Sequence, residues 1–233
     1  MGVILEYVGV NKNFGDKQVL KDINLKIKSN KIVGLLGKNG SGKSTLFKLA
    51  NDLLTLSSGE VLIDGKPISV ESKKIVSYLP ERTYLNPSLK VSDAIKLFET
   101  FYEDFDRVKA EKLLSELQLD MNMRLSKMSK GMKEKVQLVL VMSRNAKIYI
   151  LDEPLGGVDP ASRDYILQTI LKNFNKDATL LISTHMIADI EKILDEVIFI
   201  DEGKIVLQED AEKLRKIENA TIDEIFRRKF YVR

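Results

Sequence analysis

The first third of the chain shows short apolar runs separated by turn residues, which is the pattern of strands. Residues 3–10 and 19–27 predict two strands, and the second alternates apolar and polar positions as a half-exposed strand does. Residues 31–37 have the pattern of a buried strand, and this strand ends in a glycine-rich loop. Residues 59–68 predict a hairpin that turns at Asp64–Gly65. We expect these segments to form an antiparallel N-terminal layer.

Helical spacing of apolar residues begins after the glycine-rich loop and dominates the middle of the chain. It predicts helices over residues 44–54, 91–119 and 130–144. Four aromatic residues of the second helix fall at i, i+3, i+4 and i+7, and they are Phe98, Phe101, Tyr102 and Phe105. This spacing predicts one buried stripe, with a groove for a partner as the alternative.

The last third alternates strand-like and helix-like segments, which is typical of a parallel sheet with right-handed crossovers. The segments lie at 147–154, 160–174, 178–184, 186–195, 196–201 and 204–208. The fold expected for residues 1–233 is a single α/β domain. It has a mostly parallel sheet, the N-terminal antiparallel β layer and an inserted helical subdomain at about 82–142.

Composition and charge narrow the classes of function. The 37 basic and 34 acidic residues leave a net charge of +3, which is too balanced to indicate nucleic-acid binding. The absence of cysteine excludes disulfides and thiolate metal sites. The N-terminus lacks a signal-peptide pattern, and no apolar run approaches the roughly 18 to 20 residues that cross a bilayer. A role at a membrane would therefore need another chain.

The glycine-rich loop carries the pattern G-x-x-x-x-G-K-[ST] between a strand and a helix, which predicts a phosphate-binding loop. Its glycines let backbone N–H groups surround phosphate oxygens, and the next helix adds its dipole. Lys43 is expected to reach the β- and γ-phosphates, and Ser44 to ligate Mg²⁺. A glycine-rich turn without a ligand is disfavoured by this composition and placement. The expected nucleotide-binding residues are Gly37, Lys38, Asn39, Gly40, Ser41, Gly42, Lys43, Ser44 and Thr45.

Two carboxylates follow the apolar strand at 147–154. The strand places Asp152 at its carboxyl edge, where open parallel sheets bind ligands. Asp152 is expected to hold Mg²⁺ through water, and Glu153 to polarise an attacking water. A solvated acidic turn is the alternative, and it would be preferred without the phosphate-binding loop upstream.

His185 is the only histidine of the chain. It follows the strand at 178–184, the next predicted parallel strand after the one that ends at Asp152. A crossover brings neighbouring strand ends to one sheet edge, so His185 is expected near Glu153 and the γ-phosphate. The alternative is a structural or merely exposed histidine.

These motifs resemble those of ATP-binding subunits of ABC transporters, and the resemblance covers nearly the whole chain. Family members carry the signature L-S-G-G-Q, and the equivalent here is MSKGM at 128–132. Ser129 and Gly131 keep the two positions that, in the family, contact a γ-phosphate bound to the opposite subunit. Three residues depart from the consensus: Met128, Lys130 and Met132. Without the resemblance, this segment is a helix start with lysines on a solvated face.

The resemblance assigns further residues. Phe14 matches the aromatic residue that stacks on adenine, which is more often Tyr in the family. Glu81 replaces the usual glutamine and is expected to accept from water or approach Mg²⁺. Asp159, in the segment GGVDP, is expected to help hold a dimer. His185 matches the histidine that bonds the γ-phosphate, so the implied catalytic residues are Lys43, Glu153 and His185.

The resemblance implies a Mg²⁺-dependent ATPase with ATP and Mg²⁺ as its cofactors. Two subunits would sandwich two ATP molecules, as a homodimer or with a second ATP-binding subunit. They would drive a separate transmembrane permease from the cytoplasmic face of the cell membrane, and residues 81–84 would contact that permease. The resemblance favours an exporter. The alternative is a soluble ABC-type ATPase that remodels a protein assembly without a membrane partner. The basic, aromatic segment at 225–233 predicts a solvated helix end, with a surface for lipid headgroups as the alternative.

Overall fold

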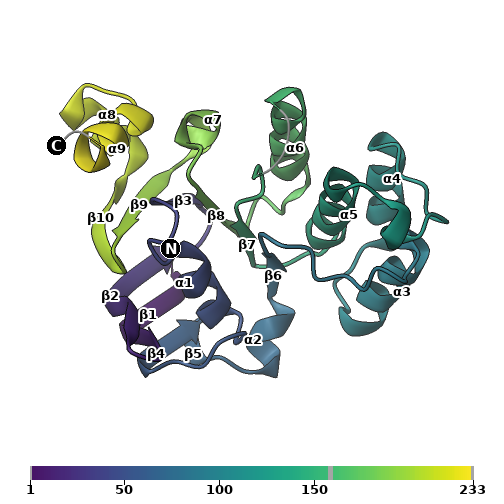
Figure 1. Cartoon of the computed structure of the whole chain (residues 1–233), viewed down its shortest axis with the longest axis horizontal. Helices are drawn as coiled ribbons and strands as arrows, with labels where there is room; N and C mark the ends of the chain where they lie inside the picture. The colour runs from purple at the N-terminus through teal and green to yellow at the C-terminus, as the bar shows by residue number, and fades with distance from the viewer. Residues whose placement is uncertain (1, 157–159, 232–233) are drawn as a thin grey trace.

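The chain folds into two β-sheets with helices packed against them, seen in a computed structural model that describes residues 2–156 and 160–231 (Figure 1). The strands are β1 (Val3–Phe14), β2 (Lys17–Lys28), β3 (Ile32–Leu36), β4 (Ser58–Ile63), β5 (Lys66–Pro67), β6 (Val76–Leu79), β7 (Ile148–Asp152), β8 (Thr179–Thr184), β9 (Glu196–Asp201) and β10 (Lys204–Asp210). The α-helices are α1 (Lys43–Ala50), α2 (Val70–Lys74), α3 (Val91–Phe101), α4 (Arg107–Glu116), α5 (Lys130–Met142), α6 (Pro160–Asn173), α7 (Ile187–Ile190), α8 (Ala211–Glu218) and α9 (Ile222–Phe230). Two 3₁₀ turns are η1 (Leu125–Lys127) and η2 (Glu191–Ile193).

The larger sheet has the strand order β10-β9-β3-β8-β7-β6. All its neighbouring strands run parallel except β9 and β10, which pair antiparallel at the edge. The smaller sheet, of order β2-β1-β4-β5, is antiparallel throughout. Its turn at Asp64 and Gly65 has φ angles of +52° and +74°, as the two-residue hairpin requires. The predicted α/β fold with an antiparallel N-terminal layer is confirmed.

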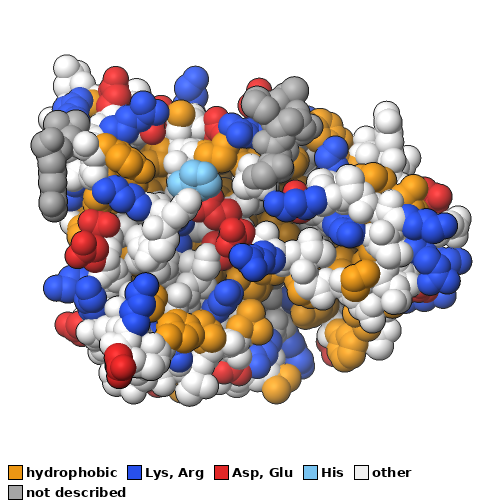
Figure 2. All heavy atoms as spheres, viewed as in Figure 1, with side chains coloured by type: hydrophobic (Ala, Val, Ile, Leu, Met, Phe, Trp, Pro, Cys, Tyr) orange, Lys and Arg blue, Asp and Glu red, His pale blue; other side chains and the backbone are white. Residues whose placement is uncertain are grey.

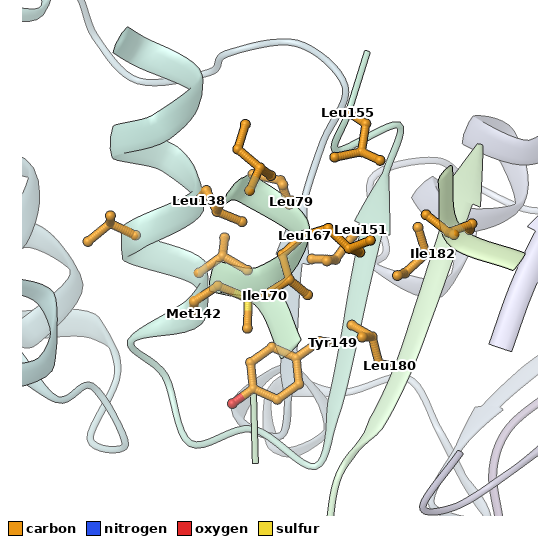
Figure 3. Close-up of a cluster of buried hydrophobic side chains, with 14 of the residues drawn as sticks. Leu79, Leu138, Met142, Tyr149, Leu151, Leu155, Leu167, Ile170, Leu180 and Ile182 are labelled. Carbon is orange, nitrogen blue, oxygen red and sulfur yellow. The ribbon is translucent and has the colours of Figure 1, made fainter. Parts of the chain in front are cut away.

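Alternate side chains of the parallel strands enter two separate hydrophobic clusters. On one face, Leu35 and Ile150 pack with α1 and the N-terminal sheet. On the other face, Leu151 and Ile182 pack with the remaining helices. Figure 3 shows part of the second cluster, where side chains of β7 and β8 meet those of α5 and α6. Burial on both faces explains why these strands are almost wholly apolar.

Helices α3, α4 and α5 follow β6 and precede β7, which is where the sequence predicts the inserted subdomain. They lie together at one end of the molecule, away from the N-terminal sheet (Figure 1). None of the helices in the described ranges has both the length and the apolar character needed to cross a bilayer.

Three predicted helices are wrong in extent. The helix expected over 44–54 ends at Ala50, because Asp52 takes a left-handed φ of +55°, and Leu53 is exposed. The segment 91–119 forms two helices, since Asp106 caps a new one by accepting from the Lys109 N–H. The segment 186–195 is helical only over the four residues of α7, followed by η2.

The predicted aromatic stripe is also only partly correct. Phe98 is buried, and the rings of Tyr102 and Phe105 lie 5.3 and 5.7 Å from its own. Phe101, however, is 71% exposed, because α3 ends there and Tyr102 already has an extended backbone. The aromatic cluster therefore forms because the chain turns after α3 and brings Tyr102 and Phe105 back to Phe98. It does not lie along one face of a single helix.

The C-terminal helix α9 packs onto the parallel sheet instead of ending in solvent. Phe226 is buried, and its ring meets Phe199 of β9 at 5.4 Å and Phe230 at 4.4 Å. The expectation of a solvated helix end is wrong for these aromatic side chains. The basic residues Arg227 and Arg228 remain outside the packed face, as expected.

Candidate active site

Two glycines allow the tight shape of the loop between β3 and α1. A Cβ atom at Gly37 would lie 2.5 Å from the carbonyl oxygen of Ile200 on β9, so a side chain does not fit. Gly42 has a φ of +112°, which is accessible to glycine almost alone. The N–H of Ser41 donates to the Lys38 carbonyl at 3.1 Å and closes the turn. The predicted phosphate-binding loop therefore has the tight strand–loop–helix geometry that its sequence indicates.

Lys43 points into the hollow of this loop. Its side chain is only 5% exposed, and Nζ donates to the carbonyl oxygens of Gly37 at 2.8 Å and Lys38 at 3.2 Å. Nζ also lies 3.3 Å from Oε1 of Glu153. A buried ammonium group surrounded by oxygen atoms is well placed to exchange these partners for phosphate oxygens.

Glu153 lies between Lys43 and His185. Its Oε2 is 2.9 Å from Nδ1 of His185, while its Oε1 faces Lys43. This arrangement follows from the sheet, because β7 and β8 are parallel neighbours whose carboxyl ends meet at one edge. The predicted proximity of Glu153 and His185 is confirmed, and His185 remains 44% exposed toward the open side.

Asp152 is the last residue of β7 and is 1% exposed. Its Oδ1 accepts from the Ser183 hydroxyl at 2.6 Å, whereas its buried Oδ2 has no hydrogen-bond partner among the described residues. Burial raises the pKa of Asp152, and the nearby hydroxyls of Ser183 and Ser44 act in the opposite direction.

These residues fit a Mg²⁺ ion that is shared with a nucleotide. The unpaired Oδ2 of Asp152 and the hydroxyl of Ser44 are hard oxygen ligands of the kind that Mg²⁺ prefers. Within residues 2–156 and 160–231, no cluster of three or more acidic, His or Cys side chains offers a complete metal site. The remaining ligands would therefore be phosphate oxygens and water, as is usual for this ion.

A cavity of about 840 Å³ opens over the loop and is lined by Glu153, whereas Asp152 is absent from the wall that the described residues form. Its size suits a nucleotide. The predicted residues that line it are Asn39, Gly40, Gly42, Lys43, Ser44, Thr45, Glu81, Glu153 and His185. Figure 2 shows the single histidine at the surface with acidic and basic side chains near it.

Glu81 also reaches this cavity. It follows β6, is exposed, and lines the cavity together with Glu153 and His185. Its negative charge contributes to raising the pKa of Asp152. A role for Glu81 as a Mg²⁺ ligand stays a prediction.

Lys38, although part of the loop, turns its side chain away from the cavity. Its Nζ donates to the carbonyl oxygen of Phe230 in α9 and lies 4.8 Å from the centre of the Tyr231 ring. The lysine thus ties the phosphate-binding loop to the C-terminal helix. Only its backbone remains available for the predicted contact with a nucleotide.

Phe14 lies beside the cavity rather than in its wall. It ends β1, is 47% exposed, and carries the ammonium group of Lys12 at 4.8 Å from its ring. Its cross-strand neighbour Lys17 does line the cavity, whereas Phe14 is absent from the wall that the described residues form. Stacking of Phe14 on adenine stays a prediction.

Ser129 and Gly131 stand at the start of α5, apart from the phosphate-binding loop. The Ser129 hydroxyl accepts from the Met132 N–H at 3.2 Å and caps the helix, and a Cβ at Gly131 would meet nothing within 4 Å. Considering the described part of the chain, neither residue lines the cavity over the loop. Of the GGVDP segment, Gly156 lines that cavity, whereas Gly157 and Asp159 lie outside the described residues.

Two features of the site are missing from the sequence-based prediction. Lys17 and Lys21 of β2 add positive charge to the cavity wall. Ser183, buried on β8, contacts both Asp152 and Glu153. The sequence signal for Ser183 is weak, because it is only a polar residue in a mostly apolar strand, and its alignment with Asp152 is seen only in the sheet.

Known proteins are similar to this chain in sequence and in fold. The sequence profile of the ABC transporter family matches residues 20–156. The ABC transporter ATP-binding protein YtrB of Bacillus subtilis (strain 168) is 28% identical over 216 residues, 91% of this chain and 74% of YtrB. The lantibiotic transport ATP-binding protein SrtF of Streptococcus pyogenes is 28% identical over 218 residues, 92% of this chain and 94% of SrtF.

A solved structure of the ATP-binding subunit of an ABC transporter has a TM-score of 0.85 and 26% identity, covering 96% of this chain and 98% of that one. The similarity in sequence therefore extends to the whole arrangement of elements. The chain belongs to the ABC transporter family, and it is an ATPase subunit of that family.

Proposed function

We propose that this chain hydrolyses ATP as one half of an ATP-bridged dimer, and that the dimer drives a separate transmembrane permease in export. The observation that carries the proposal is the position of Glu153, whose carboxylate lies between Lys43 and His185 at the cavity over the loop. A base, a phosphate-binding cation and an imidazole at one point suit the hydrolysis of a γ-phosphate.

Each side chain has a distinct task in this reaction. Lys43 neutralises charge on the β- and γ-phosphates, and Glu153 orients and deprotonates the attacking water. His185 has Nδ1 engaged with Glu153, so Nε2 is the nitrogen that a γ-phosphate would meet. Asp152 and Ser44 would hold Mg²⁺, whose positive charge would stabilise the negative charge that develops on the phosphate groups.

The position of Ser129 supports a dimer. Ser129, Lys130 and Gly131 expose the N-terminus of the thirteen-residue helix α5, whose unpaired N–H groups favour an anion. Among the described residues, Ser129 and Gly131 do not reach the chain's own cavity, so we propose that they complete the cavity of a second copy. ATP would then hold two copies together, and ADP, without the γ-phosphate, would release them.

A second cavity supports a permease partner. It has a volume of about 700 Å³ and lies where β6 meets the helical subdomain. Tyr84 and Leu53, both more than half exposed, offer apolar contact there, and Glu81 lines both cavities. We propose this cleft as the permease contact, which places the chain at the cytoplasmic face of the membrane. Export rests on the resemblance of residues 77–93 and 129–135 to ATPases associated with exporters.

Light scattering of Glu153→Gln with and without ATP tests the dimer. Removal of the base should trap the ATP-bound form, so we expect the mass to double on addition of ATP. Adding Ser129→Arg should abolish the doubling, whereas the matched Ser115→Arg on the exposed face of α4 should not. A Glu153→Gln protein that binds ATP but stays at the mass of one chain would rule out self-pairing.

The permease contact can be tested by cross-linking because the chain has no cysteine. A Tyr84→Cys variant carrying a short photo-cross-linker should join a membrane-embedded subunit in the membranes of its own cell. The same probe at exposed Glu60 on β4, introduced by Glu60→Cys, should not. Equal cross-linking from both positions, or none to a membrane subunit from Tyr84→Cys, would contradict the proposed cleft.

A further inference from the structure

Ser183 is a fully buried residue near the end of β8, at 0% exposure. In the parallel ladder between β7 and β8 it is the partner of Asp152. It belongs to no motif in the sequence, and the other residues of β8 are apolar except for Thr179 and Thr184. Its hydroxyl nevertheless contacts both acidic residues of the active site.

The hydrogen bonds of this hydroxyl have a fixed direction. Oγ donates to Oδ1 of Asp152 at 2.6 Å and accepts from the N–H of Glu153 at 3.0 Å. A hydroxyl has one donor and two acceptor positions, so both bonds form at once. The backbone carbonyl of Ser183 accepts from the same N–H at 3.2 Å.

The first bond determines which oxygen of Asp152 is left for a metal ion. With Oδ1 held by Ser183, the carboxylate cannot rotate without losing a short bond inside the protein. Oδ2 then remains buried and without a partner among the described residues. Outer hydrogen bonds of this kind orient the residues that bind metal ions.

The second bond fixes the backbone of Glu153. This residue has a φ of +50°, in the left-handed region, which residues other than glycine adopt only at a cost in free energy. Its N–H is held by two acceptors of Ser183, the hydroxyl and the carbonyl. The side chain then leaves the strand toward Lys43 and His185 instead of continuing along it.

We propose that Ser183 is a positioning residue for ATP hydrolysis, whose single hydroxyl orients the carboxylate of Asp152 and the backbone of Glu153 at the same time. The proposal rests on the proposed roles of Asp152 in holding Mg²⁺ and Glu153 in activating water. Ser183 touches neither ATP nor the metal ion in this proposal. It acts through the two acids.

Four variants separate the hydroxyl from the size of the side chain. Ser183→Ala removes the hydroxyl alone, Ser183→Thr keeps it with an added methyl, and Ser183→Val has the shape of Thr without the hydroxyl. Ser183→Cys keeps the size of serine but offers only a weak donor. If the added methyl does not fit, the comparison of Ser183→Ala and Ser183→Cys with wild type still tests the hydroxyl.

We expect Ser183→Ala and Ser183→Val to lower kcat for ATP hydrolysis by about 10- to 100-fold. The Mg²⁺ concentration that half-saturates hydrolysis should rise by about 10-fold, because Asp152 is no longer oriented. Binding of ATP in a metal chelator should stay within about twofold of wild type, since the loop is unchanged and the protein is folded. Ser183→Thr should restore kcat and the Mg²⁺ requirement, and Ser183→Cys should fall between.

A second measurement does not depend on hydrolysis. In the Glu153→Gln background, the Mg²⁺ concentration that half-saturates ATP-driven mass doubling should also rise about 10-fold on Ser183→Ala. A residue that only supports folding would lower the amount of active protein without moving either Mg²⁺ midpoint. The Mg²⁺ midpoint is therefore the decisive observation.

The controls distinguish this proposal from the proposed function. If Ser183→Ala and Ser183→Val hydrolyse ATP like wild type while Asp152→Asn and Glu153→Gln do not, only the positioning role is overturned. If Asp152→Asn keeps the Mg²⁺ midpoint of wild type, the assigned metal role fails, and the role of Ser183 toward Asp152 fails with it. If none of the four Ser183 variants binds ATP in the metal chelator, the proposal is overturned in favour of a purely structural role.

Discussion

The burial of the Asp152 carboxylate destabilises the folded protein. It is almost fully buried, its Oδ2 lacks a partner among the described residues, and burial raises its pKa. An ionised carboxylate that has lost water without full replacement destabilises a fold. The same unsatisfied oxygen is what a metal ion would bind, so the cost and the chemistry have one source.

Replacing Asp152 by Asn should therefore stabilise the metal-free protein at pH 7 by about 1 kcal/mol. The pKa of Asp152 is raised above its ordinary value of 3.8, so ionisation weakens the fold above the raised pKa. The penalty should fade as the pH falls through that pKa and be absent below 3.8. Denaturation curves in a chelator at pH 7 and pH 4 should show the difference between the two proteins narrowing.

Mg²⁺ and ATP should reverse this order, because only wild type gains their binding energy in full. An Asn variant that is less stable than wild type in chelator at pH 7 would show that burial of the charge is not the dominant effect at this position.

Phe14 offers a second test at single-residue resolution. Its ring is half exposed beside the cavity, and Lys12 covers part of it. Stacking of a base on an aromatic ring contributes about 1–3 kcal/mol, so Phe14→Ala should weaken ATP binding about 10-fold. Phe14→Tyr keeps the face of the ring and should bind within about twofold. Calorimetric titration checks both, and equal affinity of Phe14→Ala and wild type would remove Phe14 from the site.

Sequence reasoning found the residues of the site whose type is chemically unusual. His185 and the loop around Lys43 stand out because imidazole is used once and glycine clusters before a lysine. Ser183 does not stand out, because a serine in a strand has many structural roles. Its importance depends on the register between β7 and β8, which is a tertiary property.

Elements were predicted well where apolar periodicity is unbroken, and less well at their ends. The buried strands and the hairpin at Asp64–Gly65 follow directly from the pattern. The end of α1 and the start of α4 do not, because the left-handed Asp52 and the capping Asp106 interrupt a pattern of apolar residues that continues past them. Capping and left-handed residues decide such boundaries, and they leave only a weak mark in the hydrophobic pattern.

The packing of helix α9 was also not predicted from the sequence. The contribution of its aromatic face to stability can be tested by substitution. Phe226 is its buried anchor, whereas Tyr231 is 64% exposed at its end. Phe226→Ala should lower the free energy of unfolding by about 3–4 kcal/mol, because a large cavity opens against Phe199. Tyr231→Ala should cost less than about 1 kcal/mol. Urea denaturation of the two variants checks this, and equal losses would mean that the helix is not held by its aromatic face.

The order of strands in the larger sheet could not be predicted from the chain. Strand β3, early in the sequence, lies between β8 and β9, which come much later. Such pairings are set by contacts between distant segments rather than by local preference. One pairing was inferable, because consecutive parallel strands joined by a crossover helix are usually neighbours, and it correctly placed His185 near Glu153.

A buried cation adds polar contacts to the apolar packing between the helical subdomain and the sheet. The guanidinium of Arg144 donates to Asp104 at 2.9 Å and lies 3.8 Å from the centre of the Tyr102 ring. It also donates to the backbone carbonyls of Lys74, which ends α2, and Val76, which begins β6. Arg144 thus joins the loop after α3 to the strand that leads to Glu81.

Loss of Asp104 should loosen this connection without changing nucleotide binding. Asp104→Ala leaves the buried guanidinium of Arg144 without its anionic partner and should cost about 2–3 kcal/mol of stability. Exposed Glu103 provides the matched control, and Glu103→Ala should cost less than about 0.5 kcal/mol. Hydrogen exchange should accelerate in α3 and α4 of Asp104→Ala but not in α1, because the weakened contact lies at the edge of the sheet. Equal exchange in the two variants would mean that the subdomain is held by its apolar contacts alone.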